Sequence, residues 1–206
     1  METEFEAKFY PVNKEEYRKK LKSVGAKLTV PERKMRRVIA DTNANPNLNC
    51  DYIRVRDEGN LVRLSAKITA NEGGQVGDQK EDDVVVADFD KTKKVLEDAG
   101  LKFNRYQETL REEWEFDGAT ITIDTWPGLE TYSEIETNSE EKVKEIAEKL
   151  GFDWDKKILT PAAEVFAKVY GLSIDEVLEK ISGITFEKNP FKDLKKVWTQ
   201  DISVKI

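Results

Sequence analysis

The sequence Glu4-Phe5-Glu6-Ala7-Lys8-Phe9 alternates charged and apolar residues. Successive side chains of a β-strand point to opposite faces, so this alternation is typical of a strand with one buried face. Glu4, Glu6 and Lys8 then share one face, and the apolar residues share the other. Taken alone, the pattern indicates a half-buried strand whose outer face is solvated.

The same division recurs in later segments with strand character. Arg54-Val55-Arg56 and Glu134-Ile135-Glu136 each place two charged residues around an apolar one. Lys67 follows the apolar Leu64 and Ala66 at the opposite parity. Charges of both signs on the non-core faces of an antiparallel sheet predict a polar groove or tunnel, with the apolar faces packed outward under helices. A set of ordinary strands with solvated charged faces is the alternative.

The segments between these strands contain amphipathic helices, which makes the expected fold α+β. The expected helices are 14–24, 88–100 and 139–150, each followed or ended by glycine. The expected strands are 4–9, 27–41 with an interruption near Pro31, 52–57, 61–69, 80–87, 102–116, 119–126 and 131–137.

A change of sequence character near residue 150 predicts two parts. Residues 1–150 form the charged-strand domain, and residues 151–206 form a C-terminal helical extension packed on it. Thr160-Pro161 and Ser173 predict the starts of two short helices in this extension. The sequence gives the extension no recognisable chemistry.

Composition narrows the classes of function. The 206 residues carry a net charge of −7, which argues against nucleic acid as a partner because no global positive field is present to hold a phosphate backbone. Cys50 is the only cysteine, which excludes an internal disulfide and fits a reducing cytoplasm. No segment resembles a signal peptide or a bilayer-spanning run, so we expect a cytoplasmic protein without a membrane partner.

The absence of histidine limits the chemistry further. A metal site in this chain is built from oxygen ligands, which favours Mg²⁺ or Mn²⁺ over zinc. The usual histidine general base is also excluded.

Two charged pairs are open to two interpretations each. Glu134 and Glu136 are two residues apart on a strand, about 7 Å, and are either unremarkable surface residues or a pair of metal ligands. Arg54 and Arg56 are either solvated or form guanidinium forks that grip phosphate. Carboxylates for metals and cations for phosphate oxygens on facing strands are the arrangement that phosphoryl chemistry requires.

The order of these residues resembles the CYTH superfamily of triphosphate tunnel metalloenzymes over residues 2 to about 150. Glu4, Glu6 and Lys8 match its ExExK motif. The match continues in order through Asp41-Thr42, Leu48, Ile53-Arg54-Val55-Arg56, Lys67, Glu81, Asp83, Arg111, Asp124 and Glu134-Ile135-Glu136.

This resemblance implies an eight-stranded antiparallel β tunnel with a polar interior, and it implies a role for each matched residue. The triphosphate would be held by Lys8, Arg54, Arg56, Lys67 and Arg111. Glu134 and Glu136 would bind the metal that engages it, with Asp124 and Glu81 nearby. Glu4 and Glu6 would serve a second metal and orient or activate the attacking water.

One position departs from the family pattern. Many members place a lysine two residues before the counterpart of Arg111, where this chain has Thr109. The change weakens one end of the phosphate grip and leaves the substrate open. Arg36, Arg37 and Arg63 are candidates to compensate, and the sequence does not say which of them faces inward.

The resemblance leaves several functions open. The first is a Mg²⁺- or Mn²⁺-dependent triphosphatase that acts on inorganic triphosphate, thiamine triphosphate or a nucleoside triphosphate. The second is a class IV adenylate cyclase, in which the ribose 3′-hydroxyl attacks instead of water. A non-catalytic polyphosphate-binding module and a purely structural domain are the others. We expect hydrolysis, because the candidate substrate rim at 71–80 is polar and glycine-rich and offers no adenine pocket. Both a monomer and a homodimer are consistent with the sequence.

Overall fold

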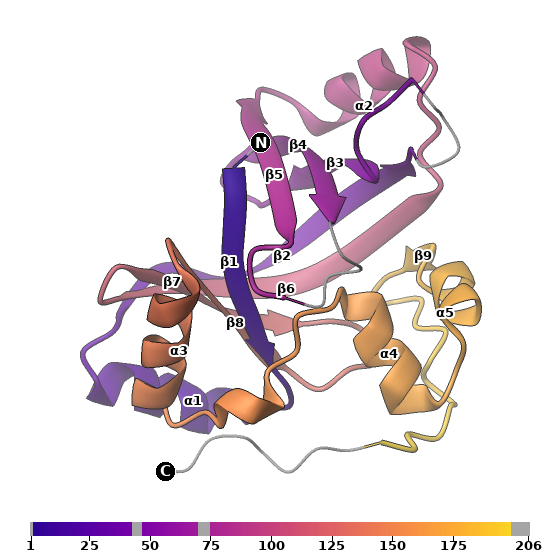
Figure 1. Ribbon diagram of the computed structural model, residues 1–206. Helices are drawn as coiled ribbons and strands as arrows, with labels where there is room; N and C mark the ends of the chain where they lie inside the picture. The colour runs from indigo at the N-terminus through magenta and orange to yellow at the C-terminus, as the bar shows by residue number, and fades with distance from the viewer. Residues whose placement is uncertain (1, 43–46, 70–74, 199–206) are drawn as a thin grey trace.

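Strand β1 (Glu2–Phe9) occupies a central place in the computed structural model, which describes residues 2–42, 47–69 and 75–198. It lies between β5 (Gln79–Val86) and β8 (Tyr132–Thr137), antiparallel to both. Its register places Glu6 opposite Glu136 and Lys8 opposite Glu134. The charged residues that share a face of β1 therefore meet the charged face of β8. Figure 1 shows β1 and β8 side by side in the sheet.

The sheet closes on itself. β2 (Lys27–Asp41) pairs with β3 (Tyr52–Asp57), which pairs with β4 (Val62–Thr69) and then β5. On the other side of β1, β8 pairs with β7 (Ala119–Thr125), and β7 pairs with β6 (Arg105–Phe116). Pairing of β2 with β6 completes a closed eight-stranded antiparallel barrel. The predicted α+β tunnel fold is confirmed.

Two expected boundaries differ in detail. β2 is not interrupted at Pro31 but continues through it, with register shifts between Leu28 and Arg33 that absorb the irregularity. The strand expected from residue 102 begins at Arg105, because Leu101 is used to cap the preceding helix through a bond from its N–H to the carbonyl of Leu96.

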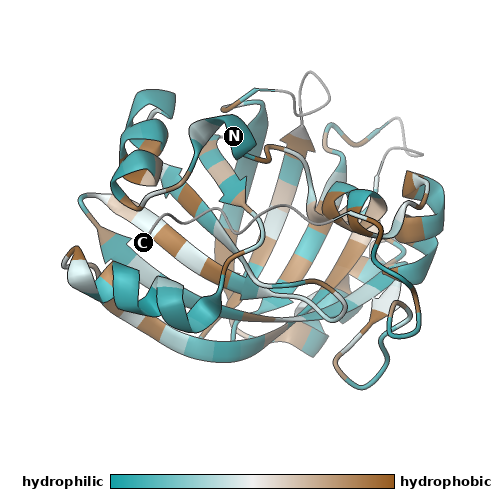
Figure 2. Ribbon diagram, turned by 90° about the horizontal axis from the view of Figure 1, so that it is seen from below, coloured by the Kyte–Doolittle hydropathy of each residue, from teal (hydrophilic) through white to brown (hydrophobic). Residues whose placement is uncertain are grey.

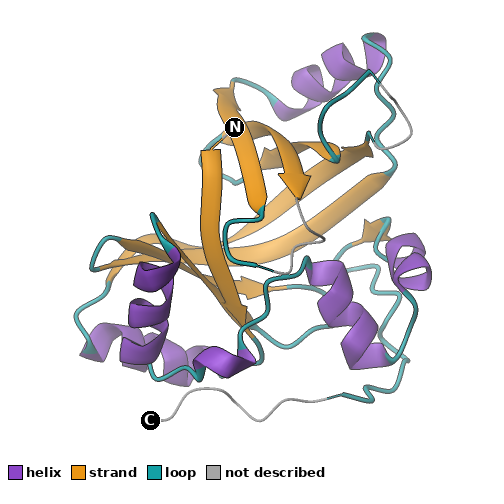
Figure 3. Cartoon of the chain, viewed as in Figure 1, coloured by secondary structure: helices purple, strands orange, loops and turns teal. Residues whose placement is uncertain are grey.

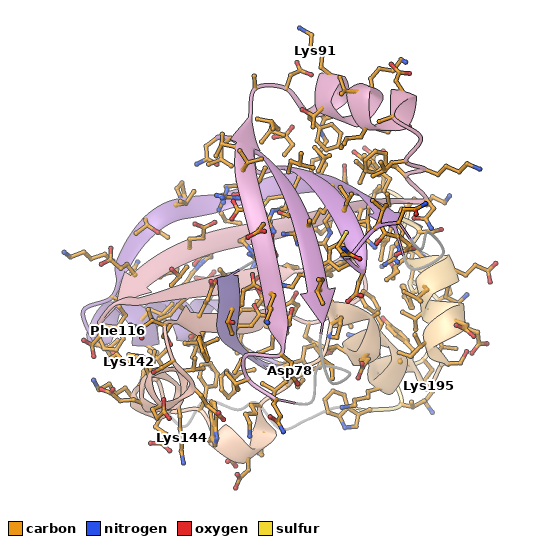
Figure 4. The ribbon with its side chains drawn as sticks, turned by 45° about the horizontal axis from the view of Figure 1, so that its top comes forward. Asp78, Lys91, Phe116, Lys142, Lys144 and Lys195 are labelled. Atoms are coloured by element: carbon orange, nitrogen blue, oxygen red, sulfur yellow. The ribbon has the colours of Figure 1, made fainter. Side chains whose placement is uncertain are left out.

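Helices cover the outside of the barrel (Figure 3). α1 (Lys14–Ser23) and α3 (Glu140–Lys149) share one hydrophobic core with the outward faces of β1, β7 and β8. Buried members of this core include Phe9, Leu21, Ile121, Ile135 and Ile146. α2 (Phe89–Asp98) packs near β3 at the other end of the molecule. In Figure 4, Lys91 of α2 and Lys144 of α3 point outward, away from the barrel.

The apolar faces are thus used on the outside of the barrel, and the interior is left to the charged faces. Hydrophilic and hydrophobic residues alternate along the strands in Figure 2 as this division requires.

The described residues 151–198 lie against the barrel, and only part of them is helical. They form the 3₁₀ turn η2 (Trp154–Lys156), α4 (Ala162–Tyr170), α5 (Ile174–Lys180) and the short strand β9 (Gly183–Ile184), which pairs parallel to β6. α4 and α5 share a second core with Trp126 and Tyr132 of the barrel region. Ile158 exchanges backbone hydrogen bonds of 2.9 and 2.8 Å with Lys8. The division at residue 150 remains a prediction.

Across the described ranges, no helix combines the length and apolar character needed to cross a membrane.

Candidate active site

A cavity of about 420 Å³ lies inside the barrel, and the inward-facing side chains of its strands line it. Every residue that the sequence assigns to the site lines this cavity: Glu4, Glu6, Lys8, Arg54, Arg56, Lys67, Glu81, Arg111, Asp124, Glu134 and Glu136. The alternative of solvated charged strands is therefore wrong for these faces. The role of each residue stays a prediction.

Lys8 lies between two carboxylates. Its Nζ is 2.7 Å from Glu6 Oε1 and 3.6 Å from Glu134 Oε1, as the pairing of β1 with β8 requires. Burial alone would raise the pKa of Glu6, but the charges of Lys8 and Lys67 lower it to about 2. Glu6 is therefore ionised, and Lys8 is held as a cation at the cavity wall.

Lys67 and Arg54 form a second linked group of charges. Lys67 Nζ lies 2.6 Å from Glu4 Oε2 and 3.5 Å from Glu81 Oε2. Arg54 Nη2 donates to Glu81 Oε1 at 2.7 Å. Burial opposes the ionisation of Glu81, but Arg54 and Lys67 lower its pKa to about 2. Arg54 Nε is buried and donates to no atom of the described residues, so this guanidinium keeps a donor for the oxygen of a ligand.

Arg111 of β6 reaches a carboxylate on the neighbouring strand β7 and another on β8, the strand beyond it. Its Nε donates to Asp124 Oδ1 at 2.7 Å, and its Nη2 donates to Glu134 Oε2 at 2.6 Å. Thr122 donates a further hydrogen bond of 2.6 Å to Asp124 Oδ2. Burial opposes the charge of Arg111, but the two carboxylates raise its pKa well above the ordinary value.

Arg56 is held by a carboxylate that the sequence interpretation missed. Glu58 Oε1 accepts from Arg56 Nε and Nη2 at 2.8 and 2.6 Å and from Arg63 Nε at 3.2 Å. Arg63 also pairs with Asp83. Glu58 follows Arg54 and Arg56 at a spacing of two residues, so strand alternation predicts that it faces the same side. It was missed because it lies just after the end of β3, at the start of a turn.

Glu136 is the exception among these carboxylates. No ion pair joins it to another described residue, and more than a third of its side chain is exposed. Its partial removal from bulk water, followed by repulsion from Glu6, Glu4 and Glu134, raises its pKa to about 7. A cation at this position would relieve that repulsion.

The carboxylates fit a hard divalent cation in type and charge, because all of their donor atoms are oxygens. Within the described ranges, however, no three Asp, Glu, Cys or His side chains already form a cluster that could hold a metal. Glu4 and Glu6 are turned toward Lys67 and Lys8 instead. A metal at Glu4 or Glu6 would compete with these lysines for the carboxylate oxygens.

The structure shows which of Arg36, Arg37 and Arg63 face the cavity near Thr109. Thr109 lines the cavity, and so do Arg37 and Arg63. Arg36 faces outward, where its Nε donates to Asp57 Oδ2 at 3.1 Å and its guanidinium lies 4.4 Å from the centroid of the Phe89 ring.

One part of the cavity is apolar and aromatic, which the sequence did not predict. The barrel supplies Ile39, Tyr52 and Trp126, and the C-terminal segment supplies Pro161, Ala162, Ala163 and Ile181. The segment after residue 150 thus contributes to the site. Of the rim expected at 71–80, residues 71–74 lie outside the described part of the chain.

Several solved structures have the same fold as this chain. A conserved hypothetical protein from Pyrococcus furiosus is 21% identical with a TM-score of 0.64, over 77% of this chain and 97% of that chain. A candidate adenylate cyclase from Vibrio parahaemolyticus is 12% identical with a TM-score of 0.68, over 81% and 98%. A candidate adenylyl cyclase from Hippeastrum, described as having a dominant triphosphatase activity, is 15% identical with a TM-score of 0.51, over 84% and 97%. These likenesses show the fold alone.

The sequence comparisons differ in outcome. No curated protein sequence matches the chain. The family model of the CYTH domain matches residues 2–170, which includes every barrel strand and extends through α4. The chain therefore belongs to the CYTH domain family.

Proposed function

We propose that this protein is a divalent-metal-dependent hydrolase of triphosphate substrates. The observation that carries the proposal is the convergence of Lys8, Arg54, Arg56, Lys67 and Arg111 on one enclosed cavity, beside a cluster of carboxylates. Cations suit the oxygens of a triphosphate chain, and carboxylates suit the metal that accompanies it. Members of the CYTH family process triphosphates and in general depend on metal ions.

In this proposal the cations bind phosphate oxygens. Arg54 offers its unused Nε, and Lys8 and Lys67 exchange their carboxylate partners for the substrate. That exchange releases Glu4 and Glu6 at the same time. Substrate and metal binding are thus expected to support each other, because each removes a partner with which the other competes.

Glu134 and Glu136 would hold a Mg²⁺ or Mn²⁺ ion, with Asp124 and Glu81 nearby, and Glu4 and Glu6 would serve a second ion. Such ions neutralise charge on the phosphate chain and lower the pKa of bound water. Glu4 or Glu6 would orient the attacking water, since the chain has no histidine for that task.

Adenylate cyclase activity is the second candidate, and the apolar part of the cavity is the observation that favours it. Base recognition needs an apolar slot with a few placed polar groups. Tyr52, Trp126 and Ile181 give the cavity some of that character. The same surface equally suits the organic group of a triphosphate that is hydrolysed, so it favours an organic triphosphate more than it favours cyclisation.

The products decide between these activities. The protein is incubated with tripolyphosphate, ATP and thiamine triphosphate under Mg²⁺ and under Mn²⁺, and the products are separated. Inorganic phosphate released from one or more of them supports hydrolysis. Cyclic AMP and pyrophosphate as the main products from ATP, with tripolyphosphate left uncut, would reverse the order of the two candidates. A protein that binds these compounds but converts none of them would be a polyphosphate-binding module.

A further inference from the structure

Arg37 differs from the other cations of the cavity. Within the part of the chain that the structure describes, each of the others has a carboxylate partner: Lys8, Arg54, Arg56, Arg63, Lys67, Arg105 and Arg111. Arg37 has none. Its guanidinium brings an uncompensated positive charge into the barrel.

The side chain of Arg37 is nevertheless fixed in place. Its Nε donates to Gln107 Oε1 at 2.9 Å, and Gln107 Nε2 donates to the carbonyl oxygen of Ile181 at 3.0 Å. Its guanidinium carbon lies 4.4 Å from the centroid of the Trp126 ring, and Trp126 Nε1 donates to the hydroxyl of Tyr132 at 2.8 Å. The two terminal nitrogens of Arg37 donate to no described residue. The guanidinium of Arg37 is thus fixed through Nε, and its two terminal nitrogens remain available to a hydrogen-bond acceptor of a ligand.

The position is unfavourable for a cation when no ligand is bound. Arg37 lies directly opposite Arg56 across the pairing of β2 with β3, and like charges in that position repel each other. Burial, followed by the charges of Arg54 and Arg56, lowers the pKa of Arg37 to about 9. A neutral side chain here would avoid both the burial of a charge and the repulsion from Arg54 and Arg56.

We propose that Arg37 is an additional anion-binding residue, whose terminal nitrogens hold a phosphate oxygen of the substrate in the space it shares with Arg54 and Arg56. This rests on the proposed function for the identity of the ligand as a triphosphate. The C-terminal segment takes part, because the carbonyl of Ile181 orients Gln107, and Gln107 orients Arg37. Arg37 and Trp126 together would set how far the phosphate chain enters this side of the cavity.

The test compares Arg37→Met with Arg36→Met, a change of the same kind at the neighbouring residue on the opposite face of β2. Tripolyphosphate and, separately, inorganic phosphate are titrated by calorimetry in EDTA, which excludes metal and turnover. Thermal unfolding is recorded for each protein with and without the anions. We expect Arg37→Met to bind tripolyphosphate at least about tenfold more weakly, as the loss of a charge-assisted contact predicts. Arg36→Met should bind like the wild type.

Thermal unfolding supplies a second signature. Because Arg37 lies opposite Arg56 and has no carboxylate partner among the described residues, Arg37→Met should unfold at a higher temperature than the wild type when no anion is present, which also shows that it folds. A residue with a merely structural role would lower that temperature. Equal tripolyphosphate affinity in Arg37→Met and the wild type overturns the inference. Wild-type protein that binds inorganic phosphate through Arg37 but does not bind tripolyphosphate keeps this subsite and counts against the triphosphatase proposal. Binding of neither anion overturns the subsite, and the product assay with Mg²⁺ or Mn²⁺ then decides the triphosphatase proposal by itself.

Discussion

Glu136 and Glu6 lie directly opposite each other on paired strands, and only Glu6 has a cation beside it. Lys8 compensates Glu6, whereas Glu136 faces three other carboxylates in the cavity without an ion pair to a described residue. In the proposed function, this asymmetry makes the β8 side of the cavity the place where a divalent cation would relieve the most repulsion. In that proposal Glu4 and Glu6 exchange a lysine for a metal ion, whereas Glu136 has no ion pair to a described residue that it would have to break.

Glu134→Gln and Glu136→Gln should each abolish most activity while leaving the fold intact, because an amide keeps the volume of the side chain and loses the charge that binds metal. We expect a loss of about a hundredfold or more, since metal-ion catalysis contributes several kcal/mol. Activity is measured across a range of Mg²⁺ concentrations. Glu140→Gln, on the exposed first turn of α3, is the control. Full activity of the double variant at low Mg²⁺ would remove both residues from the site.

Arg56→Lys should weaken binding of the triphosphate substrate as much as Arg56→Ala does. Arg56 uses two nitrogens toward one side of the cavity, and a lysine supplies a single point charge in place of a fork. We expect the KM for the triphosphate substrate to rise about tenfold in both variants. Steady-state kinetics on the best substrate of the product assay measure this. Wild-type kinetics in Arg56→Lys would show that Arg56 is not a fork on phosphate.

The charged faces of β1, β3 and β8 could be predicted from the sequence because alternation is a geometric property of strands. Glu4, Glu6 and Lys8 needed only their spacing to be placed together. Arg36 and Arg37 could not be separated in this way, because the register shifts between Leu28 and Arg33 reset the parity of β2 at positions that no local rule specifies. Ile181 reaches the cavity through packing between segments far apart in the chain, which spacing does not report.

Glu58→Gln should destabilise the protein in a pH-dependent way. Burial alone would raise the pKa of Glu58, but Arg56 and Arg63 lower it below the ordinary value of 4.5. The folded state therefore keeps Glu58 ionised at a pH where the unfolded state already binds a proton. Its contribution to stability is complete above pH 4.5 and is lost as the pH falls through the lowered folded-state pKa.

The expected loss in Glu58→Gln at neutral pH is about 2 kcal/mol, since two partly buried arginines lose a buried carboxylate that accepts their hydrogen bonds. Urea unfolding of the wild type and the variant at several pH values measures the difference, in which the titration of other groups cancels. Asp57→Asn is the matched control, because Asp57 pairs with the outward-facing and partly exposed Arg36. A difference between wild type and Glu58→Gln that stays constant down to pH 2 would contradict this assignment.

Thr109→Lys should recover tripolyphosphate binding in the Arg37→Met background. Thr109 lines the cavity on β6, two residues from Gln107, which holds Arg37, so a lysine there returns one positive charge to the same region. Recovery should be partial, because an ammonium cannot reproduce the planar fork of the arginine. Calorimetric titration in EDTA measures it, with Leu110→Lys in the same background as the control that adds the charge on the other face of β6. If Leu110→Lys recovers binding equally, net charge rather than placement is responsible. If neither variant recovers binding, Arg37 does not replace the lysine that many family members have at the position of Thr109.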